Sequence, residues 1–429
     1  ISLLPLIELT ISNDKSWVND LPHFLQQFLS NNHSLINLNN LLIFIITLFL
    51  MKFIFLMFAL ILSGSAAANT TAFLRMQLFS QLNQTKWNFF TKISSGRISN
   101  CLVTEIASIG GSYNLVVNLL STFLIIIIYL IISFITSPYI TISSLVMSII
   151  TALILKSIIS LTKKNTLKHV DGMNSFMGEI NENLLLFKSI KAMGIEHKFL
   201  SIISKTFDKL KKFQKKIIIY LGALQIILEP IFVIFLVILV YFATLLSPEN
   251  LVSTKFIFLI IIFYRIFTKV SSLQVFFQKL TNSHVYFESY NKLLLDAKNH
   301  SEIYTGRKKI KNLKSIKFKN VNFKYDNFYV LKNLSFKISS NKITTIVGPS
   351  GKGKTTILDL LSFLYKPNSG EILINSIPLS QIDILSWRDK IGYVGQDSFL
   401  LNDTIINNIT FRDEKVNLKK IEDVLRFSN

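Results

Sequence analysis

The chain has 429 residues, half of them hydrophobic, with a mean hydropathy of +0.46 and a formal net charge of +21. This composition is too apolar for an ordinary soluble domain, so it excludes that class and predicts membrane spans. The chain contains one cysteine, Cys101, which excludes an intrachain disulfide.

Apolar runs long enough to cross a bilayer, about 20 residues each, recur through the first two thirds of the chain. They predict five complete spans, and the apolar residues 1–10 predict the remnant of another. Because the first residue is Ile1, we expect the chain to be a fragment that begins inside a longer protein. The predicted complete spans are residues 41–62, 113–135, 140–161, 217–246 and 251–267.

Basic residues are concentrated in two long loops, residues 66–112 and 162–216, whereas the tight turns near Pro138 and Pro248 carry none. Lys and Arg accumulate on the cytoplasmic side of membrane proteins, so we expect both loops and everything after Thr268 to be cytoplasmic. This topology accounts for much of the positive charge and argues against a nucleic-acid-binding protein.

Both loops mix apolar and charged residues at helical spacing, which predicts helices over residues 74–90 and 180–213. A further polar helix is predicted over residues 281–299. Two charges within spans have no assigned role. Lys52 either contacts the head group of an anionic lipid or substrate, or it extends its stem toward the interface or lines the helix bundle structurally. Glu229 is expected near the cytoplasmic interface.

The pattern changes to strands after a linker that we place at residues 300–314. Alternating apolar residues predict two strands, and short apolar runs bounded by turn residues predict three more. The predicted strands are Ile316–Tyr325, Leu334–Ile338, Ile343–Val347, Glu371–Ile374 and Ile391–Val394, with a helix over residues 354–364.

A phosphate-binding loop follows the third predicted strand and fits the pattern G-x-x-x-x-G-K-[ST] without a mismatch. Its glycines allow backbone N–H groups to surround phosphate oxygens, and the helix that begins at Lys354 adds the positive end of its dipole. Lys354 is expected to bind the terminal phosphates and Thr355 to hold Mg²⁺. The loop residues are Gly348, Pro349, Ser350, Gly351, Lys352, Gly353, Lys354, Thr355 and Thr356.

Around this loop, residues 319–375 (KNVNFKYDNFYVLKNLSFKISSNKITTIVGPSGKGKTTILDLLSFLYKPNSGEILIN) resemble the start of an ATP-binding cassette (ABC) nucleotide-binding domain. Upstream, RMQLFSQLNQTKWNFFTKISSGRISN and ENLLLFKSIKAMGIEHKFL resemble the two intracellular loops of an export-type ABC transporter. The resemblance implies an all-α transmembrane helical bundle over residues 1–299, followed by a partial α/β P-loop NTPase domain over residues 315–429.

The resemblance also implies roles for particular residues. Tyr325 would stack on adenine, Gly348–Thr356 would form the Walker A loop around ATP, and Gln396 would be the Q-loop glutamine that contacts Mg²⁺ and the attacking water. After Gln396, no segment fits the family's signature motif, its Walker B strand or its switch histidine. Phosphoryl transfer depends on positioning and charge neutralisation, so we expect this chain to bind ATP without hydrolysing it.

The expected function is ATP-driven export or flipping of a substrate. The expected partners are a second copy of the chain or a paralogous half-transporter, membrane lipids and a substrate that the sequence does not identify. The expected location is a bacterial inner (plasma) membrane, with the nucleotide-binding domain in the cytoplasm. The alternative is a membrane-anchored P-loop protein that senses ATP without transport, and no nucleic-acid partner is expected.

Overall fold

The structure is a computed structural model that describes residues 38–136, 138–246, 254–396, 400–413, 416 and 418–428. The chain divides into two compact units, Ile1–Glu302 and Ile303–Asn429, which we take separately. The predicted remnant span at residues 1–10 and the turn near Pro248 lie outside the described residues.

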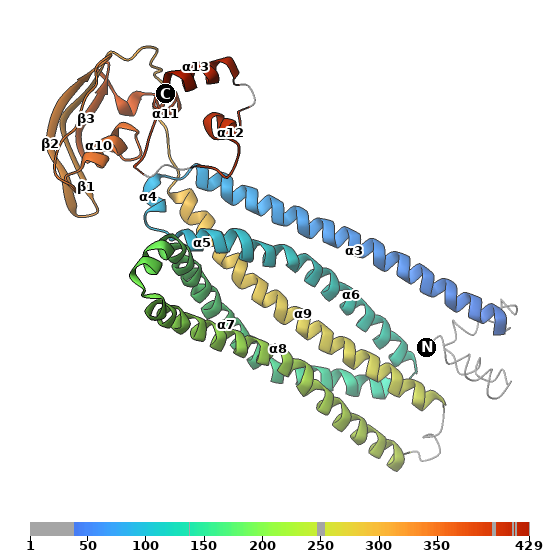
Figure 1. The fold of residues 1–429 in the computed structure, drawn as a ribbon. Helices are drawn as coiled ribbons and strands as arrows, with labels where there is room; N and C mark the ends of the chain where they lie inside the picture. The colour runs from blue at the N-terminus through green and yellow to red at the C-terminus, as the bar shows by residue number, and fades with distance from the viewer. Residues whose placement is uncertain are drawn as a thin grey trace. The chain divides into compact units, whose positions relative to one another are not determined.

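Long helices make up the first unit (Figure 1). In chain order they are α3 (Leu38–Asn83), α4 (Trp87–Phe90), α5 (Ser95–Asn100), the π-helical turn η3 (Cys101–Glu105), α6 (Ile106–Thr136), α7 (Pro138–Met193), α8 (Glu196–Leu246) and α9 (Thr254–Asn299).

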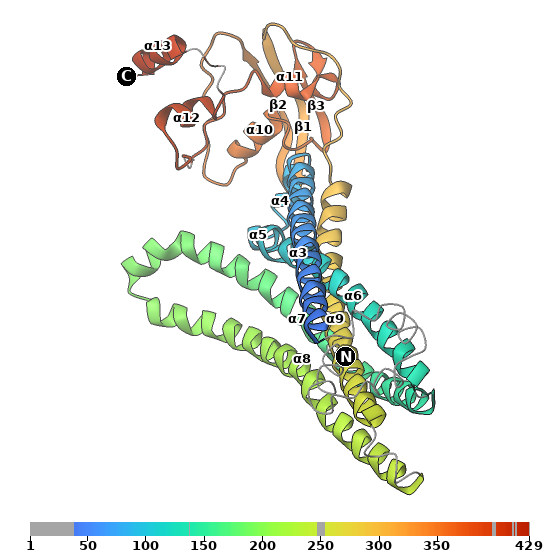
Figure 2. The same ribbon diagram turned by 90° about the vertical axis from the view of Figure 1, so that its right-hand side faces the viewer.

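Helix α6 packs along α9, so helices from distant parts of the sequence lie side by side, and the consecutive helices α7 and α8 pack along each other (Figure 2). The best-packed core of this unit joins the C-terminal end of α3 to that of α9. Leu78 and Leu293 are buried there against Tyr290 and Ala297. Most described apolar side chains of α3 and α6 outside this core are exposed, as expected for helices that face a bilayer.

Three described helical segments are long and apolar enough to cross a membrane: Leu42–Asn83, Ser95–Ile135 and Ile260–Asn299. They contain all or part of three of the predicted spans. The other two, 140–161 and 217–246, lie within α7 and α8, where several side chains are not among those described.

The predicted loop helices are each divided by a turn. Residues 74–90 form the end of α3 and the separate short helix α4, and a backbone bond from Lys86 N to His300 O (2.9 Å) holds the turn between them. Residues 180–213 divide between α7 and α8 at Gly194, whose φ of +63° ends α7 in the left-handed conformation that glycine favours. The predicted helix 281–299 is confirmed as the end of α9.

The second unit is built on an antiparallel sheet with strand order β2-β1-β3-β4. Its strands are β1 (Ser315–Tyr325), β2 (Phe328–Ser339), β3 (Ser369–Ile374) and β4 (Ile377–Pro378). Its helical elements are α10 (Lys354–Leu361), η5 (Leu379–Gln381), α11 (Ile384–Arg388), α12 (Ile405–Thr410) and α13 (Leu418–Ser428).

One face of this sheet carries the core of the unit. Phe318 and Val321 of β1 and Ile374 of β3 are fully buried, and Leu360 of α10 and Trp387 of α11 complete the cluster. The alternation of apolar and polar residues therefore predicts β1 and β2 correctly, and the predicted strand Glu371–Ile374 falls within β3.

The predictions of strands at Ile343–Val347 and Ile391–Val394 are wrong for this structure. Neither segment belongs to a strand, and Ile343 and Val394 are almost completely exposed. A strand forms only where a neighbouring strand satisfies its N–H and C=O groups, and no described segment pairs with either run. The helix predicted to end at residue 364 ends instead at Leu361.

Candidate functional site

The loop Gly348–Thr356 takes a conformation that depends on two of its glycines. Gly351 has a φ of +77° and Gly353 a φ of +83°, in the left-handed region that side chains disfavour. A Cβ atom on Gly353 would also lie 2.8 Å from Val330 Cγ1 and 2.9 Å from Leu331 Cδ2. The loop therefore packs against β2 at a point where only glycine fits.

Lys354 closes the loop onto itself. Its ammonium donates hydrogen bonds to Gly348 O at 2.9 Å and to Pro349 O at 2.8 Å. Both acceptors are neutral carbonyls, and a phosphate oxygen would be a stronger partner for the same cation. The ammonium thus lies inside the loop and already points at the space that the loop surrounds.

The beginning of α10 offers further donors. Gly353 occupies the N-cap position and no side chain caps the helix, so the N–H groups of its first turn are left for a ligand. An anion is the natural occupant of such a helix end. Thr355 is exposed beside these groups, whereas Thr356 is buried at 5% exposure and packs into the unit.

This set of donors fits the phosphates of a nucleoside triphosphate. The open N–H groups, the Lys354 ammonium and the exposed Thr355 hydroxyl together present positive charge and a magnesium-type oxygen ligand. ATP bound here would supply the phosphoanhydride bond, and Mg²⁺ would neutralise its charge.

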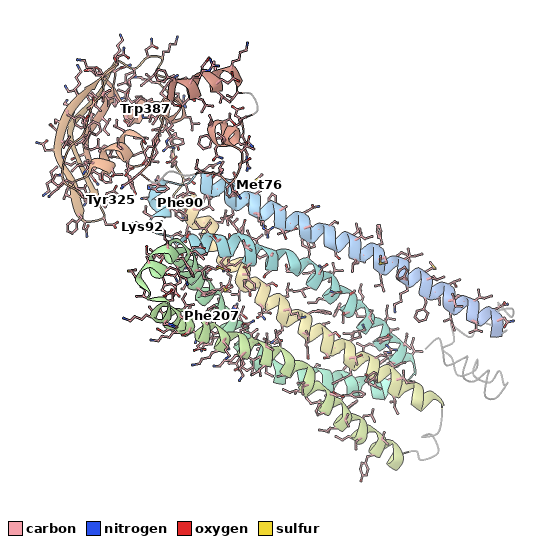
Figure 3. All side chains as sticks on the ribbon, viewed as in Figure 1. Met76, Phe90, Lys92, Phe207, Tyr325 and Trp387 are labelled. Carbon is pink, nitrogen blue, oxygen red and sulfur yellow. The ribbon has the colours of Figure 1, made fainter. Side chains whose placement is uncertain are left out.

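Tyr325, at the end of β1, lies beside the same helix (Figure 3). Its hydroxyl is 3.5 Å from Thr356 Oγ1 and 3.4 Å from Asp359 Oδ2. Phe323 and Tyr365 each meet its ring edge-to-face, with centroids at 4.8 and 5.2 Å, while 37% of Tyr325 remains exposed. The two edge-to-face contacts therefore hold the Tyr325 ring in place, and part of the ring remains accessible to a ligand.

Burial changes the acidity of two groups at this point. It raises the pKa of the Tyr325 phenol, which the carboxylate of Asp359 also disfavours in its charged form. Burial likewise raises the pKa of Asp359, and the hydrogen bond from Tyr325 opposes that change. The sequence pattern singled out Tyr325 but not Asp359, because a carboxylate within an amphipathic helix gives no signal of its own.

The remaining predicted site residues are exposed. Pro349, Ser350 and Lys352 of the loop are exposed, and so is Gln396. Within the described part of the chain, no side-chain contact joins Gln396 to the loop. The structure therefore brings Tyr325 to the start of α10 and leaves the role of Gln396 a prediction.

Two residues that sequence reasoning missed hold the other end of α10. Trp387 Nε1 donates to Leu361 O at 2.7 Å, and the Arg388 guanidinium donates to Ser362 O and Phe363 O, each at 3.2 Å. These bonds satisfy carbonyls that the helix C-terminus leaves open. The signal available in the sequence was Asp383, the N-cap of the short helix that carries both residues.

Comparison with known protein families matches both units. Residues 14–270 match the family model of the ABC transporter transmembrane region, and residues 331–428 match that of the ABC transporter. The first match alone covers more than half of the chain.

Two similar curated proteins match most of the chain. One is the heterocyst differentiation ATP-binding protein HepA of Nostoc sp., 27% identical over 88% of this chain and 62% of its own length. The other is the multidrug resistance-like ATP-binding protein MdlA of Buchnera aphidicola, 28% identical over 83% of this chain and 62% of its own length. The chain thus spans less than two thirds of these relatives.

The solved structure of a bacterial Atm1-family ABC exporter with ATP bound has the same fold. It superposes with a TM-score of 0.76 and covers 98% of this chain and 75% of its own, at 21% sequence identity. The likeness supports the predicted fold class: a helical transmembrane domain followed by a partial nucleotide-binding domain.

Proposed function

The chain belongs to the ABC transporter family, of the exporter type, and on this premise we propose that it is the subunit of an ATP-driven exporter or flippase. The observation that carries the proposal is the phosphate loop, in which Lys354, the open start of α10 and two left-handed glycines converge. The loop supports a nucleotide site in the second unit, and the apolar helices support a membrane domain in the first, which is the combination that an ATP-driven exporter requires.

In this proposal, ATP binding exchanges one set of contacts for another. The Lys354 ammonium leaves Gly348 O and Pro349 O for the terminal phosphate oxygens, and the first-turn N–H groups of α10 take the phosphates next to it. Thr355 and Gln396 would hold Mg²⁺, which would neutralise phosphate charge, and Tyr325 would stack on the adenine. The adjoining residues Ser350, Gly351 and Thr356 shape the loop around the phosphates.

Hydrolysis requires groups that the loop does not contain. After Gln396, the sequence has no apolar strand ending in a carboxylate pair that could hold the metal and polarise water. A polypeptide of these 429 residues therefore binds ATP without turning it over, whereas a complete protein that includes such groups hydrolyses it. Two copies, or this chain and a paralogous half-transporter, would form the working dimer.

The proposed location is a bacterial inner membrane with the nucleotide-binding unit in the cytoplasm. The concentration of lysine in the loop at residues 162–216 supports that orientation, because basic residues stay on the cytoplasmic side.

The test is ATP-dependent flux of candidate lipids and drug-like molecules into vesicles that contain the complete protein. Flux should disappear in the Lys354→Met variant and persist in Lys352→Met, which removes an exposed lysine of the same loop. ATP binding by the complete protein without flux of any candidate, and without ATP turnover, would instead favour a membrane-anchored ATP sensor.

A further inference from the structure

A cluster of lysines lies where α7 and α8 leave their predicted spans. We call it the lysine belt and define it as Lys164, Lys168, Lys211, Lys212, Lys215 and Lys216. All six are exposed, and they belong to two helices that pack along each other. Lys163 is adjacent, but its ammonium is 4.0 Å from a Glu288 carboxylate oxygen, so it is not counted.

Three contacts between α7 and α8 show that the belt lysines of α7 lie close to those of α8. Phe176 and Phe207 have ring centroids 4.8 Å apart, and a Cβ on Gly172 would lie 3.0 Å from Leu210 Cδ2. Lys168 Nζ lies 6.0 Å from the centroid of the Phe213 ring, a cation–π contact between the two helices. These pairs give one antiparallel register along the α7–α8 seam.

The same register brings the ends of two predicted spans to one level. Leu161 ends the span on α7 and Ile217 begins the span on α8, and the contacts place these residues within about two helical turns of each other. Lys168 and Lys211 are each six or seven residues from those ends, or about 10 Å along the axis at the rise of an α-helix. The head-group layer is about 5–8 Å thick on each side of the hydrocarbon. The lysine side chain is long enough for its ammonium to reach back into the head-group layer from a backbone position just beyond it.

On α8 the lysines share one face. At about 100° per residue, the four lysines from Lys211 to Lys216 fall within roughly 140° of arc. Leu210, which packs against α7, is buried and lies on the other side of the helix. The charges therefore point away from the seam and toward the surroundings of the bundle.

The other helices do not share this charge. Between residues 63 and 83, α3 carries Arg75 as its only basic residue, and residues 268–287 of α9 carry Lys269 and Lys279. In contrast, residues 197–216 of α8 carry seven lysines and one acid, Asp208. A general bias toward basic cytoplasmic loops would not confine the charge to one pair of helices.

We propose that the lysine belt binds the head groups of anionic phospholipids in the cytoplasmic leaflet of the membrane. Clusters of four to eight basic residues beside a span match such lipids in charge and depth. The inference rests on the proposed membrane orientation. It adds a lipid-recognition surface on α7 and α8 that is separate from the nucleotide site.

The test measures which lipid binds first to the full chain. The chain is purified in detergent and mixed with equimolar dioleoyl phosphatidylglycerol and dioleoyl phosphatidylcholine, and singly bound adducts are counted by native mass spectrometry. We expect at least about fivefold preference for phosphatidylglycerol, the effect of one lysine near an anionic surface. The preference should weaken with salt, because the belt is exposed.

The decisive variant replaces Lys211, Lys212, Lys215 and Lys216 with Gln, and it should lower the preference for phosphatidylglycerol at least twofold, to the level that Lys164 and Lys168 alone support. The same four positions changed to Arg should keep the preference, which separates charge from folding. The matched control replaces four exposed lysines of the β1–β2 surface, Lys317, Lys319, Lys332 and Lys337, with Gln and should leave the ratio unchanged.

Four outcomes of the lipid measurement would overturn the proposal. They are no preference in the unmodified chain, loss of preference in the Arg variant, loss of preference in the control, and displacement of the lipid by inorganic phosphate. Nuclease-sensitive RNA that co-purifies through the same four lysines would also overturn it, in favour of a nucleic-acid surface. The readout uses neither ATP nor flux, so its failure is distinguishable from failure of the proposed transport function.

Discussion

Truncation of Tyr325 tests the proposed adenine contact most directly. The ring is held edge-to-face by Phe323 and Tyr365 and keeps 37% exposure, so a base has access to it without rearrangement of the core. The hydroxyl contacts with Thr356 and Asp359, at 3.5 and 3.4 Å, are long and weak. The perturbation is therefore Tyr325→Ala, with Tyr325→Phe as the matched control that keeps the ring.

The expected magnitude follows from the ring. Stacking of a base on an aromatic side chain is worth about 1–3 kcal/mol by alanine substitution, which corresponds to roughly a 5- to 150-fold rise in the Kd for ATP. Tyr325→Phe removes only the weak hydroxyl contacts, so its Kd should remain within about twofold of the unmodified chain.

The assay is equilibrium dialysis with radiolabelled ATP, with inorganic triphosphate as a competitor that has phosphates but no base. Tyr325→Ala should weaken the binding of ATP and leave the binding of inorganic triphosphate unchanged. An unchanged Kd for ATP in Tyr325→Ala refutes the stacking role. An equal loss in Tyr325→Phe would assign the effect to the hydroxyl, and an equal loss of triphosphate binding would assign it to the fold of the loop.

Three further predictions concern the same unit. Lys354→Met should raise the Kd for ATP about 10- to 150-fold in the same dialysis assay, because it removes a hydrogen bond to a charged group. Lys352→Met should change the Kd less than about fivefold. Gly353→Ala should lower the thermal midpoint of the unit and weaken ATP binding, because the new methyl group overlaps β2 at a left-handed backbone position; an unchanged midpoint would contradict the close approach of Gly353 to Val330 and Leu331. Hydrogen bonds lower the pKa of Asp403 to about 2. Its carboxylate therefore stabilises the start of α12 fully at pH values above the pKa of an unfolded Asp, about 3.9, and this stabilisation is lost as the pH falls toward 2. Limited pepsin digestion should show increased cleavage near α12 between about pH 4 and pH 2, and Asp403→Asn should remove that pH dependence.

Periodicity predicted the elements whose hydrogen bonds are local, within one helix or between strands that are adjacent in sequence. Strands β1 and β2 are adjacent in sequence and pair with each other, so the alternation of apolar residues from Ile316 to Ile338 was sufficient to find them. The same holds for α9, where one helical pattern continues from a span to Asn299. Local patterns and local pairing agree in these segments.

Periodicity could not predict which segments would lack partners. Ile343–Val347 has the composition of a central strand, but composition does not supply the neighbouring N–H and C=O groups. It also could not show that Trp387 and Arg388 bind the end of α10, since those bonds join residues 25 or 26 positions apart. The break at Gly194 was missed because apolar and charged residues are mixed at helical spacing on both sides of it.

The loss of the predicted strand at Ile343–Val347 does not remove the phosphate loop, and the reason lies in what holds the loop. Gly353 is held against Val330 and Leu331 of β2, and Lys354 ties the start of the loop to α10. None of these contacts requires a parallel ladder beside residues 343–347. Shaping the loop for phosphate is thus separable from pairing the central strand. Nucleotide binding depends on the first of these, whereas catalysis also needs carboxylates placed across the bound phosphate. The two activities therefore make separate demands on a P-loop protein: the loop holds the phosphates, and hydrolysis needs the carboxylates in addition.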